Sequence, residues 1–333
     1  MVLPRGPPKE VDVPRFTAIL PLYNKASTIN RAIASVLAQS ARDVEVIVVD
    51  DGSTDGSAEA IDKVHLAAIR LVRQDNAGPG RARNAGAALA TGELLAFLDC
   101  DDEWTPGFLE AADAALTANP GCAAYVAAYS STKKEIHEDI VLRMIPENGP
   151  RTIDSYARPV DMKAYVDCFH SSSTVVRREV FERYGGYYDR ERCLYGEDSY
   201  FWLQVALGER VYFDRTALTY FHVEDSALGV SQKGRHPRRP ALVHPEPLRK
   251  SCPPERLAKL EALLAFLRLI ETQNLVAQGK FQDIGGLRRA FPWPAGATSP
   301  VIALRELRVS ALGLLNRSKS RLAGGDDPAV QNR

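Results

Sequence analysis

The sequence lacks several features that define large classes of proteins. No stretch approaches the roughly 18 uninterrupted apolar residues of a membrane-spanning helix. The 42 lysines and arginines are balanced by 42 aspartates and glutamates, so the chain has no basic excess of the kind usual in nucleic-acid-binding proteins. Residues 1–15 hold four prolines and no apolar run, unlike a signal peptide. We therefore expect a cytoplasmic protein with no nucleic-acid partner and at most a peripheral contact with the inner face of the cell membrane.

Cysteine is also scarce and follows no pattern. The five cysteines are odd in number and widely spaced, and no two of them form a Cys-x-x-Cys pair. A disulfide framework or a structural zinc site would show an even set or a paired spacing. The sequence therefore indicates neither, and a reducing compartment is its simplest interpretation.

What the sequence does contain is a regular alternation of short apolar runs and segments with helical spacing. The runs lie at 16–20, 44–49, 69–72, 94–98 and 122–128. The helical segments between them lie at 26–39, 57–67, 79–90 and 106–118, the last with Thr105 as its expected cap. Strands that alternate with helices of this length form βαβ units, so we predict an α/β fold with a mostly parallel central sheet and helices on both faces.

The second half of the chain follows a different pattern. A short strand is expected at 174–176, and short helices at 178–184 and 199–207. Two longer helices are expected at 255–278 and 300–322. The predicted organisation is a flexible tail over 1–14, an α/β domain over 15–225, a loop or linker rich in Pro, Gly, Arg and Ser over 226–254, and a helical C-terminal extension over 255–333.

The C-terminal extension carries basic residues beside apolar ones, at Arg305, Arg308, Arg317, Lys319 and Arg321. Such a surface could meet a membrane or a second subunit. Packing of these helices onto the α/β domain is the alternative interpretation.

Open parallel sheets bind their ligands outside the carboxyl ends of the strands, so the loops after the first four strands are the expected site. The first loop contains Pro21, Tyr23 and Asn24. Tyr23 could stack on a base and Asn24 could hold the turn, unless the tyrosine simply packs. In the second loop, the carboxylate of Asp51 could accept the imide N–H of uracil. The bland interpretation of this loop is that Ser53 or Asp55 caps the following helix, and both can hold at once.

The third loop is rich in glycine and arginine. Gly78 and Gly80 accompany a helix N-terminus that carries Arg81 and Arg83, an arrangement suited to a diphosphate. It is not the dinucleotide-binding fingerprint, because Arg83 stands where that spacing requires glycine and the loop does not follow the first strand. A pair of exposed arginines on a helix is the alternative interpretation.

The fourth loop is the acidic run Asp99-Cys100-Asp101-Asp102-Glu103. In an extended chain residues two apart share a face, so Asp99 and Asp101 are expected to point the same way. Crowded carboxylates repel one another unless a cation lies among them, and hard oxygen ligands suit Mg²⁺ or Mn²⁺. A solvated acidic turn is the alternative. Such a turn would not need an apolar strand before it, and the strand therefore favours a cation site.

Two further candidates lie in the second half. Glu197 and Asp198 precede an expected helix, where a carboxylate could act as general base on a hydroxyl or could simply be favoured by the helix dipole. His222 follows an expected strand and could complete a metal site, although a lone histidine is more often structural.

Taken in order, these segments resemble glycosyltransferase family 2, the inverting enzymes of the GT-A fold. The resemblance is carried in the first half by Ile19-Leu20-Pro21-Leu22-Tyr23-Asn24, Val48-Val49-Asp50-Asp51-Gly52-Ser53-Thr54-Asp55, Asn76-Ala77-Gly78, Ala82-Arg83-Asn84-Ala85-Gly86 and Phe97-Leu98-Asp99-Cys100-Asp101-Asp102. In the second half it is carried by Arg177-Arg178-Glu179-Val180-Phe181, Gly185-Gly186-Tyr187 and Gly196-Glu197-Asp198. It covers residues 15–225 and implies a catalytic domain with a nucleotide-binding half, 15–120, and an acceptor half, 121–225. The region after Asp225 has no family motif.

The resemblance also implies a role for each matching residue. The residues implied to bind the nucleotide sugar are Pro21, Tyr23, Asn24, Asp51, Gly78, Arg83, Asp99, Cys100 and Asp101. Within this set Tyr23 and Asp51 contact the base and Arg83 the phosphate side. Asp99, Asp101 and His222 are the implied ligands of Mn²⁺ or Mg²⁺. Asp198 matches the catalytic base, with Glu197 beside it. Cys100 stands where the family often has serine or alanine.

The implied activity is metal-dependent, inverting transfer of a sugar from a nucleoside diphosphate, UDP in the preferred interpretation. The acceptor would be a hydroxyl of a saccharide, a lipid-linked or another molecule, in polysaccharide, glycolipid or glycoconjugate biosynthesis. Two alternatives stay open. A nucleotidyltransferase would release pyrophosphate, and a non-catalytic nucleotide- or carbohydrate-binding protein would show no turnover.

Overall fold

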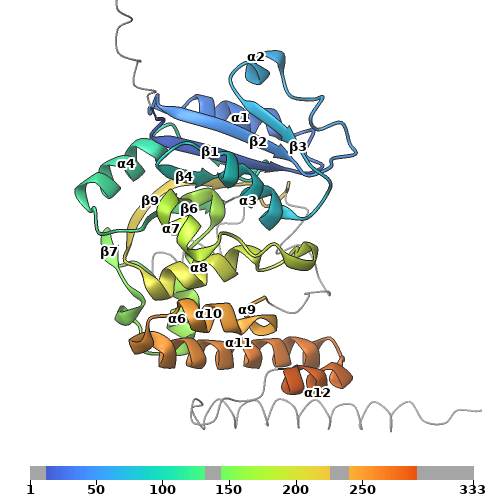
Figure 1. Ribbon diagram of the computed structural model, residues 1–333, viewed down its shortest axis with the longest axis vertical. Coiled ribbons are helices and arrows are strands. Elements are labelled where there is room, and N and C mark those ends of the chain that lie inside the picture. The colour runs from blue at the N-terminus through green and yellow to red at the C-terminus, as the bar shows by residue number, and fades with distance from the viewer. Residues whose placement is uncertain (1–12, 132–143, 226–239, 291–333) are drawn as a thin grey trace, which may run out of the picture. The chain divides into compact units, whose positions relative to one another are not determined.

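The computed structural model describes residues 13–131, 144–225 and 240–290 (Figure 1). The strands are β1 (Phe16–Leu22), β2 (Val44–Asp50), β3 (Arg70–Arg73), β4 (Leu94–Phe97), β5 (Glu103–Trp104), β6 (Ala124–Ser131), β7 (Gly149–Arg151), β8 (Thr174–Arg177) and β9 (Val211–Phe221). The α-helices are α1 (Ile29–Leu37), α2 (Lys63–Leu66), α3 (Pro79–Leu89), α4 (Phe108–Ala118), α6 (Pro159–Asp167), α7 (Arg178–Tyr184), α8 (Glu197–Gly208), α9 (Pro240–Val243), α10 (Pro245–Ser251), α11 (Leu257–Ala277) and α12 (Phe281–Ala290). Short 3₁₀ turns are η1 (Ile153–Ser155), η2 (Ser171–Ser173), η3 (Arg190–Arg192) and η4 (Pro254–Arg256).

The chain forms two compact units. The first contains residues up to 152 together with 165–229, and the second contains 153–164 together with the residues from 230 onward. The first unit therefore holds all nine strands of the described residues, and the second is helical apart from its turns.

The first unit is organised around one sheet with the strand order β3-β2-β1-β4-β8-β6-β9-β5, to which β7 adds along β9. The four strands β1 to β4 are parallel. Strand β8 runs antiparallel to both β4 and β6, and β9 runs parallel to β6. The mostly parallel sheet that the sequence predicts is therefore confirmed, and its carboxyl-end loops meet at one edge.

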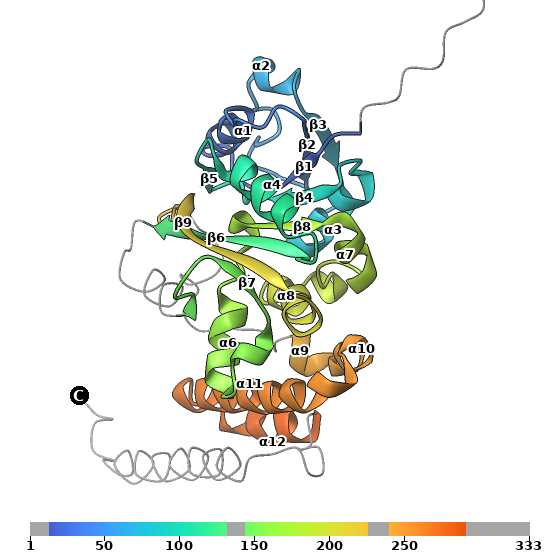
Figure 2. The same ribbon diagram turned by 90° about the vertical axis from the view of Figure 1, so that its left-hand side faces the viewer.

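Helices cover both faces of this sheet (Figure 2). On β1, Ala18, Leu20 and Leu22 point into a buried cluster with α1 and α4. On β2, Ile47 and Val49 point the other way, onto Ala82 of α3. Successive side chains of a strand alternate between faces, so strands that are covered on both sides read as continuous apolar runs. This explains why the strands were recognisable in the sequence without a period of two.

The region after β2 differs from the prediction of a helix over 57–67, since only α2 is helical there. The polar groups of this segment bond to the first loop, to α1, to β3 and to each other. Asp55 accepts hydrogen bonds from the backbone N–H groups of Ala26 and Ser57, at 3.1 and 2.9 Å. Short polar side chains that bond to nearby backbone compete with helix formation. Asp55 and Ser57 therefore hold a loop in place of a helical turn.

The predicted helix starts also shift. Helix α4 begins at Phe108 with Gly107 at its N-cap, and the side chain of Thr105 makes no capping bond to it. Instead the Thr105 hydroxyl donates to the carbonyl of Leu218, at 3.2 Å. Helix α8 begins at Glu197, two residues earlier than expected, so Glu197 and Asp198 form its first turn.

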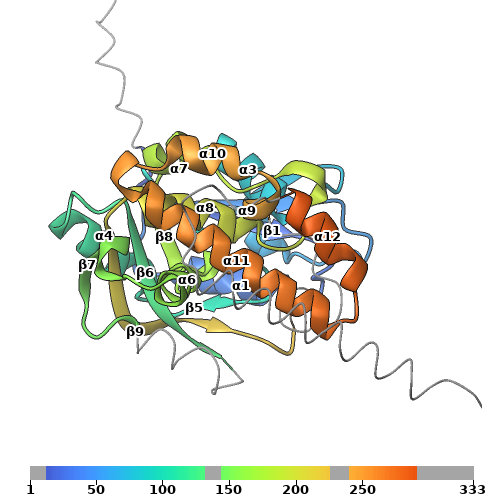
Figure 3. The ribbon, with the colours of Figure 1, turned by 90° about the horizontal axis from the view of Figure 1, so that it is seen from below.

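The second unit contains α9 to α12, in which α11 packs against α9 and α12 (Figure 3). Residues 240–251, which composition predicted to be part of a linker, form α9 and α10. Both helices begin at a proline, which suits the first helical position because its missing N–H would have no partner there. Three predicted segments lie outside the described residues: the helix over 300–322 with its basic residues, the first twelve residues of the tail over 1–14, and residues 226–239 of the linker.

In the part of the chain that the structure describes, none of the helices has the length and apolarity that crossing a membrane would require. All five cysteines carry free thiols.

Candidate active site

The first two loops are joined through Asn24. Its backbone N–H donates to the hydroxyl of Ser53, at 3.1 Å, and its side-chain oxygen accepts from the N–H of Thr54, at 2.9 Å. Asn24 has a left-handed backbone, with φ of 51°, which asparagine tolerates better than most residues. Its neighbour Tyr23 is 44% exposed. The tyrosine is therefore not a packed core residue, and its ring is open to a ligand.

Asp51 is buried and fixes the third loop. Its carboxylate accepts hydrogen bonds from the side chain of Gln74, at 2.7 Å, and from the N–H groups of Ala77 and Gly78, both at 2.9 Å. Gly78 has a φ of +95°, and a Cβ there would lie 3.1 Å from the carbonyl of Cys193. The sequence pointed to a ligand contact for Asp51 and gave no sign of this supporting role.

Pro21 and Cys100 are joined by a hydrogen bond. The buried thiol of Cys100 donates to the carbonyl of Pro21, at 3.1 Å. Burial raises the pKa of this thiol well above its usual value. Cys100 therefore joins the first and fourth loops as a neutral thiol.

Arg83 connects the fourth loop to helix α8. One guanidinium nitrogen, Nη2, lies 2.5 Å from Asp99, and the other, Nη1, lies 3.1 Å from Glu197. The ring of Tyr187 lies 5.1 Å from the guanidinium carbon, within the range of a cation–π contact. The Arg83 side chain is only 6% exposed, whereas that of Arg81 is 59% exposed. The alternative of two exposed arginines therefore holds for Arg81 alone.

The acidic run after β4 is a turn. The backbone N–H of Asp102 donates to the carbonyl of Asp99, at 2.9 Å. Each of the three aspartates consequently has a different partner. Asp99 pairs with Arg83, Asp101 pairs with Lys25 at 2.6 Å, and Asp102 accepts from the hydroxyl of Ser172 at 2.5 Å. The expectation that Asp99 and Asp101 share a face assumed an extended chain, which the turn replaces.

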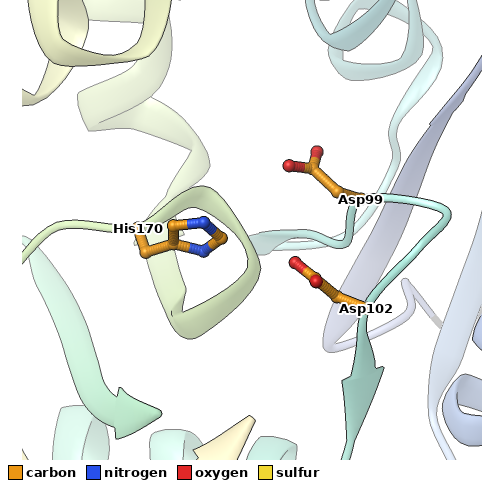
Figure 4. Close-up of side chains that lie close together, drawn as sticks. All are labelled: Asp99, Asp102 and His170. Carbon is orange, nitrogen blue, oxygen red and sulfur yellow. The ribbon is translucent and has the colours of Figure 1, made fainter. Parts of the chain in front are cut away.

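The turn instead brings Asp99 and Asp102 together with His170, which precedes η2 (Figure 4). One potential ligand atom from each side chain lies within 4.8 Å of the others. His170 stands in no motif that the sequence offers, and no local pattern could have singled it out. Its ring packs between Tyr129 and Phe221, with centroids at 5.4 and 5.1 Å.

The protonation states in this cluster differ from one group to the next. Burial opposes ionisation of Asp99, but the adjacent Arg83 guanidinium holds its pKa below the usual value. Burial, followed by the charges of Asp99 and Asp101, raises the pKa of Asp102 well above its usual value. Burial lowers the pKa of His170. Nδ1 of His170 accepts the N–H of Ser172, at 3.3 Å, so the neutral ring carries its proton on Nε2.

Glu197 and Asp198 occupy the first turn of α8 but have different surroundings. Glu197 is buried, and burial together with the charge of Asp198 raises its pKa to about 7 against the opposing effect of Arg83. Asp198 is partly exposed, and its carboxylate accepts the N–H of Ser199 at 2.6 Å. Asp198 is thus the more accessible carboxylate of the two, and Glu197 is paired with Arg83.

The side chain of His222 does not belong to the Asp99, Asp102 and His170 cluster. Its Nε2 lies 3.4 Å from Glu103, and its Nδ1 lies 3.2 Å from Glu224. Nε2 is buried and makes no hydrogen bond within the described residues. The structure therefore does not place His222 beside Asp99 in a single set of ligands.

Comparisons with known proteins extend this picture. The chain is 48% identical over 99 residues to the uncharacterized glycosyltransferase alr2836 of Nostoc sp., which is 29% of this chain and 31% of that relative. It is 45% identical over 115 residues to the succinoglycan biosynthesis protein ExoO of Rhizobium meliloti, 33% of each chain. The matching stretch thus spans about a third of the length of these curated relatives.

Solved structures share the fold. TarS 1–349 of S. aureus in complex with UDP superposes with a TM-score of 0.54 at 19% identity, covering 83% of this chain and 73% of TarS 1–349. The mannosyltransferase PcManGT from Pyrobaculum calidifontis, in complex with GDP-Man and Mn²⁺, superposes with a TM-score of 0.52 at 21% identity, covering 95% of this chain and 77% of PcManGT. The fold is that of the GT-A transferases.

The family itself is settled by the sequence match. Residues 17–185, just over half of the chain, match the family described as glycosyl transferase family 2. That stretch includes all four strand-end loops and the Asp99, Asp102 and His170 cluster. The chain belongs to glycosyl transferase family 2.

Proposed function

We propose that the protein transfers a sugar from a UDP-sugar to an acceptor hydroxyl, with inversion at the anomeric carbon and with a divalent cation at the acidic turn. The observation that carries the proposal is the double ion pair of Arg83. It fixes Asp99, at the end of β4, and Glu197, next to Asp198, on one side chain. The carboxylate at the end of β4 and the proposed base are thereby held in a fixed relation to each other, which favours an in-line displacement.

The loops on the donor side support a nucleotide at the carboxyl edge of the sheet. The exposed ring of Tyr23 offers a stacking surface, and the second and third loops are already ordered by Asn24 and Asp51. Preformed loops reduce the entropy lost on binding. TarS has been crystallised with UDP and UDP-GlcNAc, and PcManGT with GDP-Man. These neighbours support a nucleotide-sugar donor, and we choose the uridine nucleotide because Asp51 can still accept an imide N–H.

The acidic turn fits a hard divalent cation. One oxygen of Asp101 already lies 2.6 Å from the ammonium of Lys25, so the turn accommodates a positive charge there. Oδ1 of Asp102 is buried without a hydrogen-bond partner in the described residues, and such an atom is costly unless a positive charge is near. We propose that Asp99 and Asp101 hold Mn²⁺ or Mg²⁺ with Asp102 behind them, and that the side chain of His222 leaves Glu103 to become a third ligand when the cation binds. When bound, the cation would stabilise negative charge on the departing diphosphate.

His170 has a different part in this proposal. A histidine that ligates a metal usually donates the N–H of its other nitrogen. Here Nδ1 accepts the N–H of Ser172, so Nε2 keeps its proton. His170 is therefore proposed as a hydrogen-bond donor to the acidic turn.

Asp198 is proposed as the general base. It lies in the first turn of α8, close to the positive end of the helix dipole. Its partial exposure allows an acceptor hydroxyl to approach, whereas Glu197 faces Arg83. In this arrangement Asp198 removes the proton from the acceptor oxygen, and the Arg83–Glu197 pair keeps the helix turn in place.

A donor screen followed by product analysis tests the proposal. Nucleoside diphosphate sugars are first compared with Mn²⁺ for their ability to raise the melting temperature. The stabilising donor is then incubated with saccharide and lipid-linked acceptors, and the released nucleotide is identified by chromatography. We expect UDP and an inverted glycoside. Release of pyrophosphate would identify a nucleotidyltransferase, and binding without turnover or donor hydrolysis would identify a non-catalytic binding protein.

The pathway and the location are part of the proposal. Similarity to a succinoglycan biosynthesis protein supports a role in building a polysaccharide or a related glycoconjugate. The five free thiols are consistent with work in a reducing cytoplasm.

A further inference from the structure

Lys25, which lies between β1 and α1, reaches into the acidic turn. Its ammonium is 2.6 Å from Oδ2 of Asp101 and 2.5 Å from the carbonyl oxygen of Asp225, beyond the end of β9. The two side chains of the pair are only 17% and 12% exposed. An ion pair this well covered is weakly screened by solvent and salt. The backbone of Lys25 is fixed as well, since its N–H donates to the hydroxyl of Ser57 at 2.7 Å.

The partner of Asp101 differs in kind from the partner of Asp99. Arg83 is held from both sides, by Asp99 and Glu197. If its guanidinium moved away, both buried carboxylates would lose their counter-charge. Lys25 has a flexible four-carbon stem that ends in a compact point charge. Its ammonium can therefore move away from Asp101 while its backbone stays in place.

We propose that Lys25 is an internal counter-ion that occupies the cation position at Asp101 and competes with the divalent metal for this carboxylate. The inference rests on the proposed function, because it takes Asp101 as a metal ligand. Lys25 neutralises Asp101 when no metal is bound, which reduces the repulsion among the carboxylates of the acidic turn. Part of the binding free energy of the metal is then used to displace the lysine, so Lys25 sets how tightly the metal is held.

Arg31 provides a matched control. Its guanidinium belongs to the same group of charges, since Nη2 lies 2.7 Å from the carbonyl of Asp101 and 2.7 Å from the carboxylate of Asp225. Within the described residues its ion pairs are with the carboxylates of Glu103 and Asp225, and none joins it to the carboxylate of Asp101. Arg31→Gln therefore removes one positive charge from the same neighbourhood without removing the competitor for the ligand atom.

The test measures Mn²⁺ binding to the full chain, from the signal of free Mn²⁺ in electron paramagnetic resonance, with and without saturating UDP. We expect Lys25→Gln to lower the Kd for Mn²⁺ about tenfold, a coupling of ordinary size for linked sites. Arg31→Gln and Lys25→Arg should both stay within about twofold of wild type. An equal change in Lys25→Gln and Arg31→Gln would mean a general charge effect and would overturn the proposal.

Three other results would also overturn it. Weaker UDP binding by Lys25→Gln, with no gain in Mn²⁺ affinity, would make Lys25 a ligand of the donor. If Lys25→Gln does not fold, Lys25→Arg is used instead. This variant keeps the positive charge that competes with the metal, so a tenfold gain in its Mn²⁺ affinity would contradict the proposal. Absence of any saturable Mn²⁺ binding by the wild type would remove the metal site itself, whereas failure of the variant comparison alone leaves the proposed function standing.

Discussion

Arg83 and Glu197 are 114 residues apart in the sequence, yet they form a buried ion pair with 3.1 Å between Nη1 and Oε1. The pair joins helix α3 to the first turn of α8, and the same guanidinium neutralises Asp99. The organisation of the site therefore depends on one side chain that the sequence assigned to the phosphates of the donor.

Arg83→Met should leave Asp99 and Glu197 as two buried carboxylates without a counter-charge. Breaking a buried pair in this way costs about 3–5 kcal/mol of unfolding free energy. Transfer should fall by at least about 10²-fold, because both sides of the site lose their common anchor. Urea unfolding and a transfer assay measure the two effects. Arg81→Met, two residues away on an exposed side chain, should change stability by less than about 0.5 kcal/mol.

Glu197 gives stability a pH dependence. Burial, with the charge of Asp198, raises its pKa to about 7 in the folded protein, whereas its ordinary value is 4.5. The folded state therefore binds more protons than the unfolded state between these values. The stability that Glu197 contributes is fully present below pH 4.5 and is lost as the pH rises through 7. Glu197→Gln should remove on the order of 1–3 kcal/mol of this dependence.

Melting temperatures of the wild type and of Glu197→Gln, recorded from pH 4 to pH 8, check this expectation. The two curves should converge at the acid end of the range and separate above neutral pH. Parallel curves across the whole range would show that Glu197 is already ionised in the folded protein.

Asp198→Asn should lower transfer by about 10³-fold, because the amide cannot remove the acceptor's proton. Donor binding should survive, since Asp198 is partly exposed and makes only local hydrogen bonds to Ser199. Transfer rates and UDP titrations of the same preparation separate the two effects. Asp189→Asn is the control, as Asp189 lies only at 3.9 Å from the exposed Arg81. Transfer by Asp198→Asn at the wild-type rate would assign the base elsewhere.

The sequence predicts what is encoded locally. Apolar runs mark the strands, because strands covered on both faces need apolar residues at every position. Loops that follow such strands must lie at the same edge of the sheet, so the set of loops that forms the site was also predictable. The match to the family extends this to the order of the loops.

Contacts between distant segments were not predictable. Lys25 and Asp101 are 76 residues apart, and Asp102 and Ser172 are 70 apart. No local pattern specifies such pairs, because each depends on how the strands are ordered and how the loops between them turn. His170 was missed for the same reason. The acidic run illustrates a further limit, since the hydrogen bond from Asp102 to Asp99 makes it a turn and changes which carboxylates meet.

Removal of metal should abolish transfer. Excess EDTA should lower the rate to background, and Mn²⁺ or Mg²⁺ should restore it, because the departing diphosphate then regains its counter-charge. His222→Ala should raise the Mn²⁺ concentration needed for half-maximal rate about tenfold, because the cation loses a proposed ligand. The buried Nε2 of His222 makes no hydrogen bond within the described residues and is therefore available to a cation. His170→Ala should leave this concentration within about twofold. If His170→Ala raised this concentration and His222→Ala did not, the metal would be assigned to the Asp99, Asp102 and His170 cluster.

Gly80 allows helix α3 to approach the first turn of α8 closely. A Cβ at this position would overlap the carbonyl oxygen of Tyr188 and would lie 3.2 Å from Cγ of Glu197. Because the nearest obstacle is the backbone at Tyr188, the clash is removed only if α3 moves away from that segment. Overpacking of this kind costs about 1–3 kcal/mol of unfolding free energy. Because Glu197 must then move relative to Arg83, Gly80→Ala should lower transfer more than it lowers donor binding. Gly121→Ala, where an added Cβ meets nothing within 4 Å, is the control and should leave both quantities unchanged. Full activity of Gly80→Ala would show that the spacing between α3 and α8 does not control the site.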